Sequence, residues 1–320
     1  MYCTPGMFRN FSIDHIIIIC CIALPIFISC GKDSPSGPNG GGDGNSTASE
    51  FNLVFSAMTA TGFDLFTMNA GGGDPTQITN AHSGDYTPAW SPHGSTILYR
   101  ADLTEGNLTN SEIMTVKIGS SQATNLTNHP APDHAPAWSP DAMKVAFSSQ
   151  RSGDWEIWTM QVDGTNPVNI SNSPGIDYAP SWSPDGTKIA FHSSRDGDPD
   201  IFIMNADGGN QINLTANDQI RDEYPFWSPD GQRLVFLSSR GFNGLVDIWT
   251  MAADGSDLQR VTENAQHEST PRWSPDGLLI AYSKIAFGQR DLYIISTSGE
   301  NETQITNTTA VTQMPSWSPR

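Results

Sequence analysis

The chain from residue 51 onward consists of short apolar runs separated by polar turns, and this pattern repeats. The tripeptide Trp-Ser-Pro recurs every 44 to 48 residues, each time with a proline two residues before the tryptophan. The six tryptophans are Trp90, Trp138, Trp182, Trp227, Trp273 and Trp317. A period of about 45 residues is typical of β-propeller blades rather than helical repeats. The pattern therefore predicts a ring of similar β-units.

Four apolar runs in each repeat have the length and alternation of β-strands. In one repeat these runs end at Trp182, Phe191, Met204 and Thr215. The first two are joined by Ser-Pro-Asp-Gly at 183–186, which puts Pro and Gly where a tight turn needs them. Each repeat is therefore predicted to be a four-stranded antiparallel blade.

The two ends of the repeat region supply complementary parts of one blade. The last repeat stops just after the run that ends at Trp317, and the region begins at Phe51 with three runs that the last repeat lacks. We expect the C-terminal strand to pair with the three N-terminal strands and close the ring, since closure removes exposed sheet edges. The predicted fold is an all-β, six-bladed propeller of four-stranded blades over residues 51–320.

The first 29 residues are predicted to be a signal peptide. Residues Ile16–Ile28 carry no charge and are too few to span a bilayer, which matches the apolar part of a secretory signal. Cys30 follows Ser29 and precedes Gly31, and this arrangement resembles a bacterial lipoprotein signal. The resemblance implies a lipid on Cys30 and an outer-membrane lipoprotein facing the periplasm or the cell surface. The alternative is cleavage near Ser29 and a soluble periplasmic protein.

The composition narrows the possible partners. Residues 30–50 are rich in Gly, Ser and Asn and are predicted to be a flexible tether. The net charge is −18, with 16 Lys and Arg against 34 Asp and Glu, which argues against binding to nucleic acid or to an anionic membrane surface. No cysteine follows Cys30, so a disulfide or thiolate metal site is excluded from the repeats.

The repeats closely resemble the WD-like repeats of the TolB-type six-bladed β-propeller. The resemblance rests on Pro-x-Trp-Ser-Pro-Asp-Gly, on Ile-Ala-Phe at 189–191, on Ser-x-Arg-Asp-Gly at 193–197 and on Asp-Ile-Trp-Thr-Met at 247–251. It implies a monomeric, non-catalytic module that binds an envelope protein or peptide, with the membrane reached through Cys30. The alternatives are a polysaccharide lyase or hydrolase with its site at the mouth of the central channel, and a purely structural lipoprotein.

An acidic residue stands three positions before the proline in five repeats, and threonine stands there in the sixth. These residues are Asp85, Asp133, Asp177, Asp222, Glu268 and Thr312. Three turn arginines are expected on the same face, namely Arg151, Arg195 and Arg240. One interpretation is a rim at the channel mouth that binds a cation or a basic partner segment; the other is that each carboxylate pairs with an arginine or with backbone amides. Calcium suits such ligands, but no ordered ligand spacing is present, so no cofactor is predicted.

The aromatic and histidine residues give one further candidate for binding. The repeated tryptophans are expected to form the core between blades, whereas Trp155 lies in a turn and is predicted to make an exposed contact because it breaks the repeat pattern. Four histidines are expected on loops near the channel mouth, but they occupy unequal positions; they are His82, His129, His134 and His267. Specificity is expected in the uneven loops, which are residues 101–111, 217–222 and 241–245.

Overall fold

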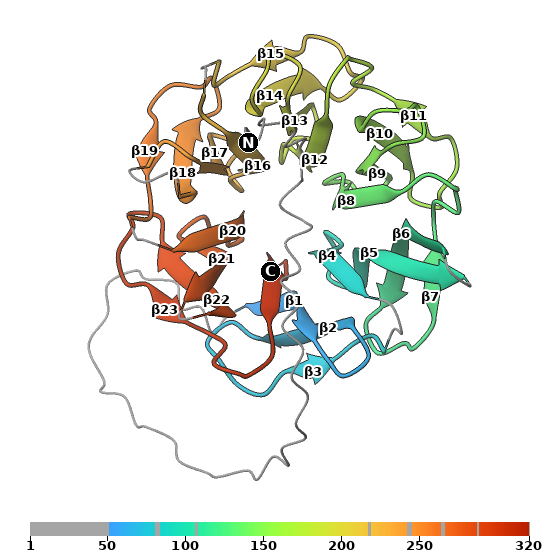
Figure 1. Ribbon diagram of the computed structural model, residues 1–320, viewed down its shortest axis with the longest axis vertical. Coiled ribbons are helices and arrows are strands. Elements are labelled where there is room, and N and C mark those ends of the chain that lie inside the picture. Colours follow the sequence, from blue (N-terminus) through green and yellow to red (C-terminus); the bar gives the residue numbers. More distant parts are fainter. Residues whose placement is uncertain are drawn as a thin grey trace, which may run out of the picture. The chain divides into compact units, whose positions relative to one another are not determined.

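The computed structural model describes residues 51–80, 84–105, 108–216, 219–241, 245–263, 266–286 and 288–319. The predicted signal peptide, Cys30, the tether and His82 lie outside these ranges. In the described residues, six four-stranded antiparallel sheets surround a common axis (Figure 1). None of the described residues belongs to a helix long and apolar enough to cross a membrane.

The blades are numbered along the chain, and their strands are given from the axis outward. Blade 1 contains β24 (Thr312–Trp317), β1 (Asn52–Met58), β2 (Phe63–Asn69) and β3 (Thr76–Gln77). Blade 2 contains β4 (Asp85–Trp90), β5 (Thr96–Glu105), β6 (Leu108–Lys117) and β7 (Ala123–Asn125). Blade 3 contains β8 (Asp133–Trp138), β9 (Lys144–Ser149), β10 (Glu156–Gln161) and β11 (Val168–Asn169).

The second half of the ring has the same organisation. Blade 4 contains β12 (Asp177–Trp182), β13 (Lys188–Ser193), β14 (Asp200–Asn205) and β15 (Ile212–Asn213). Blade 5 contains β16 (Asp222–Trp227), β17 (Arg233–Ser238), β18 (Asp247–Ala252) and β19 (Gln259–Arg260). Blade 6 contains β20 (His267–Trp273), β21 (Leu279–Ala286), β22 (Gln289–Ser296) and β23 (Thr303–Gln304).

The predicted closure of the ring is confirmed in blade 1. The C-terminal strand β24 pairs with β1 in the antiparallel register Leu53↔Trp317 and Val54↔Ser316. Ser318 N donates to the carbonyl oxygen of Asn52 at 2.8 Å, which extends the pairing beyond the strand. The two ends of the repeat region therefore hold each other in one sheet, and the ring needs no disulfide to close.

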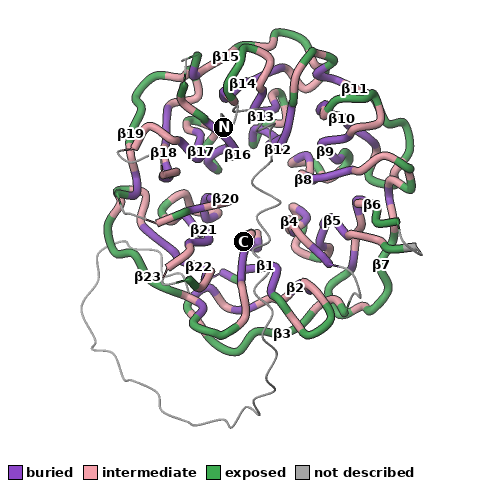
Figure 2. The backbone as a smooth tube through the Cα atoms, viewed as in Figure 1, coloured by how far each residue is buried: buried purple, intermediate pink, exposed green. Residues whose placement is uncertain are grey.

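The tryptophans of the repeat lie between adjacent blades, as the sequence predicts. Trp182 of blade 4 contacts the cluster that contains Ile157 and Ile170 of blade 3 and Phe191 of its own blade. Trp182, Trp227, Trp273 and Trp317 are between 5% and 9% exposed. Figure 2 shows buried residues gathered on the inner strands and exposed residues along the outer rim. The core is thus a set of inter-blade contacts.

Each innermost strand contains the same bulge. In blade 2, Thr87 and Pro88 lie opposite the single residue Tyr99, between the pairs Tyr86↔Arg100 and Ala89↔Leu98. Proline has no N–H, so placing it at the bulge removes no ladder hydrogen bond. The residue before each proline has a positive φ of 48° to 58°, and these residues are Thr87, Ala135, Ala179, Tyr224, Thr270 and Met314. Because it recurs in all six blades, the bulge is a feature of the fold.

The ring has two faces that differ in their connections. The loop face carries the first residues of the innermost strands and the turns between second and third strands. The proline face carries the Ser-Pro-Asp-Gly turns. In the turn at 183–186, Gly186 N donates to Ser183 O at 2.9 Å and Ser183 Oγ donates to Asp185 Oδ1 at 2.6 Å. Gly186 has a φ of 71° and faces Pro140 of the preceding blade.

Candidate functional site

Three of the predicted rim carboxylates form buried ion pairs on the loop face. Arg151 Nη2 lies 2.7 Å from Asp133 Oδ2, and Arg195 Nη2 lies 2.7 Å from Asp177 Oδ2. Arg240 contacts Asp222 at 2.6 Å, and all three aspartate side chains are 0% exposed. At these three positions each carboxylate is therefore paired with an arginine and is not open to solvent. A part for these residues in ligand binding stays a prediction.

The remaining rim positions of blades 6 and 1 are paired with backbone and hydroxyl groups. Glu268 Oε2 accepts from Ile248 N at 3.1 Å and from the hydroxyl of Thr262. Thr312 shares a hydrogen bond of 2.7 Å with Thr306. These contacts join the innermost strand of one blade to the outer strands of the preceding blade, so they stabilise the junction between blades.

Asp85 departs from this pattern because its blade has no arginine at the matching place. Leu103 stands where Arg195 stands in blade 4, and Ala101 replaces Ser193. Asp85 is 1% exposed, and its Oδ2 atom has no hydrogen-bond partner among the described residues. The pKa of Asp85 is raised to about 7, chiefly by burial; a hydrogen bond with Thr79 lowers it, and the carboxylates of Asp64 and Asp102 contribute to the rise. Asp85 therefore holds its proton up to neutral pH.

Aromatic rings form a continuous strip on the loop face across blades 3, 4 and 5. We call the following five residues the aromatic strip: Trp155, His134, Tyr178, His192 and Tyr224. The Trp155 ring centroid lies 4.6 Å from that of His134 and 5.3 Å from that of Tyr178. The strip continues from Tyr178 to His192 at 5.6 Å and from His192 to Tyr224 at 5.2 Å.

Hydrogen bonds fix the buried part of the aromatic strip. His134 Nδ1 and the Tyr178 hydroxyl are 2.7 Å apart, and Tyr224 N donates to His192 Nδ1 at 3.3 Å. His134, Tyr178 and His192 are buried, whereas Trp155 and Tyr224 at the two ends are partly exposed. The strip therefore offers two accessible rings on a rigid base. Such a surface can stack against aromatic, proline or other apolar side chains.

Sequence reasoning missed most of this strip and also a second, smaller ring cluster. Phe63 in blade 1 occupies the same place as Trp155, so Trp155 is not alone in breaking the repeat pattern. The Phe63 ring lies 5.1 Å from that of Tyr86, and the guanidinium of Arg100 lies 4.2 Å above Tyr86. The signal was available at the residue two positions before the proline of each innermost strand, which differs between blades: Tyr86, His134, Tyr178, Glu223, Ser269 and Gln313.

The other predicted loop features are only partly described. His129 Nδ1 accepts a hydrogen bond from Ala131 N at 3.0 Å, and His267 is the exposed first residue of β20. Within the described ranges, no group of three or more His, Cys, Asp or Glu side chains could hold a metal ion. Of the uneven loops, residues 101–105 and 108–111 extend the hairpin of β5 and β6.

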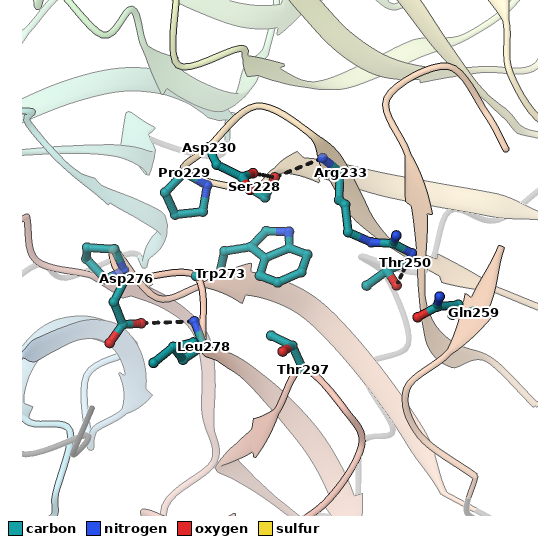
Figure 3. Close-up of a pocket in the computed structure, with 12 residues that line it drawn as sticks. Ser228, Pro229, Asp230, Arg233, Thr250, Gln259, Trp273, Asp276, Leu278 and Thr297 are labelled. Atoms are coloured by element: carbon teal, nitrogen blue, oxygen red, sulfur yellow. Dashed lines mark hydrogen bonds between the residues drawn. The ribbon is translucent and has the colours of Figure 1, made fainter. Parts of the chain in front are cut away.

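The proline face carries a separate cleft of about 640 Å³ between blades 5 and 6. Figure 3 shows Trp273 lying between Ser228 and Asp230 of one turn and Asp276 of the next. At its outer side, Arg233 pairs with Asp257 at 2.5 Å and donates to Thr250. The cleft lies where two similar turns meet, far along the innermost strands from the aromatic strip.

Six four-stranded antiparallel blades, closed by the chain's own strands, define an all-β six-bladed propeller. A family model described as the TolB beta propeller domain matches residues 105–320, and the chain belongs to this family.

Proteins named "Tol-Pal system protein TolB" are similar to parts of the chain. That from Desulfosudis oleivorans is 34% identical over 77 residues, which is 24% of this chain and 17% of the relative. That from Syntrophus aciditrophicus is 44% identical over 46 residues, which is 14% of this chain and 10% of the relative. The matched segments thus span less than a fifth of either relative's length.

Solved structures show the same fold at low sequence identity. TolB from Acinetobacter baumannii superposes with a TM-score of 0.76 at 20% identity, covering 86% of this chain and 68% of that one. An oligogalacturonate lyase in complex with manganese superposes with a TM-score of 0.57 at 15% identity, covering 81% and 74%. At these identities the likeness is one of fold alone.

Proposed function

We propose that the protein is a non-catalytic binding module of the bacterial cell envelope, which binds a protein or peptide on the aromatic strip. Membership of the TolB propeller family supports an envelope role, since two TolB relatives are named as Tol-Pal system proteins. The observation that carries the proposal is the strip itself. The tryptophans recur in all six blades as structural devices, whereas the strip joins residues that differ between blades and is confined to blades 3, 4 and 5.

The proposal includes export and a lipid anchor on Cys30. The uncharged run Ile16–Ile28 and the Ser29-Cys30-Gly31 sequence support it, and residues 30–50 would then hold a monomeric propeller away from the outer membrane. Labelling cells with a radioactive fatty acid tests the anchor. The mature wild-type chain should carry label, and a Cys30→Ala variant should not. An unlabelled wild-type chain would leave a soluble periplasmic protein as the better description.

A pull-down with the full-length chain, solubilised from membranes, tests the binding site. Wild type should capture an envelope protein that a Trp155→Ala/Tyr224→Ala double variant loses, because both accessible rings of the strip are removed. Met143→Ala is the matched control, since Met143 is 58% exposed near a turn of the proline face. Equal capture by all three proteins would place the binding surface away from the strip. The enzyme alternative rests on likeness of fold alone, and incubation with oligogalacturonate tests it directly.

A further inference from the structure

Arg272 differs from its counterparts in the other five blades. It is the fifth residue of the six-residue pattern that ends in the repeated tryptophan. The residues at the same place in the other innermost strands are small or apolar: Ala89, Ala137, Ser181, Phe226 and Ser316. Arg272 directly precedes Trp273, which lies in the core between blades 5 and 6. Because successive side chains of a strand point to opposite faces, the side chain of Arg272 leaves the strand on the face opposite to that of Trp273. A cation has therefore been placed once on the innermost layer of a ring that otherwise keeps this position uncharged.

The contacts of Arg272 leave its charge without a counter-ion among the described residues. Its guanidinium carbon lies 4.5 Å from the ring centroid of Phe226 on the innermost strand of blade 5. Nη1 donates to the carbonyl oxygen of Pro271 at 3.0 Å. None of the ion pairs between described residues includes Arg272. Arg151, Arg195 and Arg240, by contrast, each contact a buried carboxylate.

This arrangement keeps the guanidinium charged and partly available. Burial lowers the pKa of Arg272 to about 10, so the side chain remains a cation at neutral pH. The face of Phe226 attracts the cation but accepts no conventional hydrogen bond. A guanidinium has five N–H donors in a planar fork, which matches the two oxygens of a carboxylate. Arg272 is only partly buried, so a ligand can reach it.

We propose that Arg272 binds a carboxylate of a ligand that approaches the axis of the ring. The carboxylate is either the C-terminus of a peptide or an Asp or Glu side chain. This inference rests on the proposed function and defines the partner's chemistry. Tyr224, at the end of the aromatic strip, lies within electrostatic range of Arg272 and two residues before Phe226. One extended segment can therefore place an apolar side chain on the strip and its carboxylate on Arg272.

Thermal unfolding of the full-length protein with sodium acetate tests the assignment without any partner. At pH 7, acetate should raise the Tm of wild type above that in sodium chloride of equal ionic strength. The rise is on the order of 3–5 °C once acetate exceeds its dissociation constant about tenfold. Arg272→Met should abolish this difference, and Arg272→Lys should reduce it, because lysine keeps the charge but loses the fork. Arg233→Met on the proline face is the matched control and should retain it.

Two short peptides distinguish the source of the carboxylate. Acetyl-Gly-Gly with a free C-terminus and acetyl-Gly-Asp-Gly-amide should raise the Tm of wild type to different extents, and the larger rise identifies the preferred source. No acetate effect on wild type, or an equal effect on wild type and Arg272→Met, would overturn the proposal. Because this assay needs no partner, failure of the pull-down and failure of the carboxylate site are separate results. Arg272→Lys keeps the test informative if Arg272→Met does not fold.

Discussion

Replacing Asp85 with asparagine should stabilise the propeller at neutral pH and remove a pH dependence from its stability. Asp85 is 1% exposed and lacks the arginine that its counterparts in blades 3, 4 and 5 contact. Ionising it places a charge beside Asp64 and Asp102, whose carboxylates already oppose the loss of its proton. Asparagine has the shape of the protonated acid but never acquires the charge, so the penalty disappears.

The size of the effect follows from the shift in pKa. The pKa of Asp85 rises from an ordinary value of 3.8 to about 7 in the folded protein. One pKa unit corresponds to about 1.4 kcal/mol, so the folded protein loses about 4 kcal/mol when Asp85 ionises. The folded state binds the proton more tightly, so this stability is fully present below about pH 4. It is lost as pH rises through about 7.

Thermal unfolding of wild type and Asp85→Asn between pH 4 and pH 8 measures this loss. For a domain of this size, about 4 kcal/mol corresponds to a difference in Tm on the order of 10 °C. The wild-type Tm should fall relative to the variant across this range, and other titrating groups cancel in the comparison. Asp177→Asn is the matched control: it leaves Arg195 without its carboxylate and should cost about 3–5 kcal/mol. Parallel Tm curves for wild type and Asp85→Asn would refute the reasoning.

Three changes elsewhere test the repeat geometry, each by urea unfolding. Ala142 has a φ of 57° where other proline-face turns have glycine, so Ala142→Gly should stabilise by up to about 1 kcal/mol. Gly186→Ala should destabilise by a similar amount, since its Cβ would lie 3.3 Å from Pro140 Cγ at a φ of 71°. Trp182→Ala should cost about 3–5 kcal/mol, because it empties a buried contact between blades 3 and 4. A stabilised Gly186→Ala or a neutral Trp182→Ala would contradict this account of the turns and core.

The six-bladed ring could be predicted because three local signals agree. The repeat period gives the blade, the Ser-Pro-Asp-Gly turns separate its strands, and the runs after Phe51 complete the repeat that ends at Trp317. The bulge could not be predicted, because nothing in Pro-x-Trp requires a positive φ at the residue before proline. That bulge shifts the register of the innermost strands between their second and fifth residues. The direction of those side chains was therefore unknown from alternation alone.

The ion pairs could have been predicted from the sequence, but in the sequence analysis they are only one of two interpretations. Each buried aspartate of blades 3, 4 and 5 contacts an arginine 18 residues later. The same separation from Asp85 leads to Leu103, so the constant spacing also identifies the blade in which the carboxylate is not neutralised. The aromatic strip had no such spacing. It joins the innermost strands of three blades, a second strand and a turn, and these meet only after the ring closes.

The structure therefore separates two kinds of position on the innermost strands. Acidic residues and tryptophans occur at equal places in most blades. The ion pairs hold the innermost strand to the turn after the second strand of its own blade, and the tryptophans pack between neighbouring blades. In the six-residue pattern that ends in the repeated tryptophan, the second, third and fifth residues differ between blades. These positions supply Tyr178 and Tyr224 of the aromatic strip and also Arg272. The ring needs similar residues at the acidic and tryptophan positions of every blade, because every junction between blades has nearly the same geometry. The ring geometry does not fix the residues at the second, third and fifth positions, so these positions can differ between blades and bind a single partner.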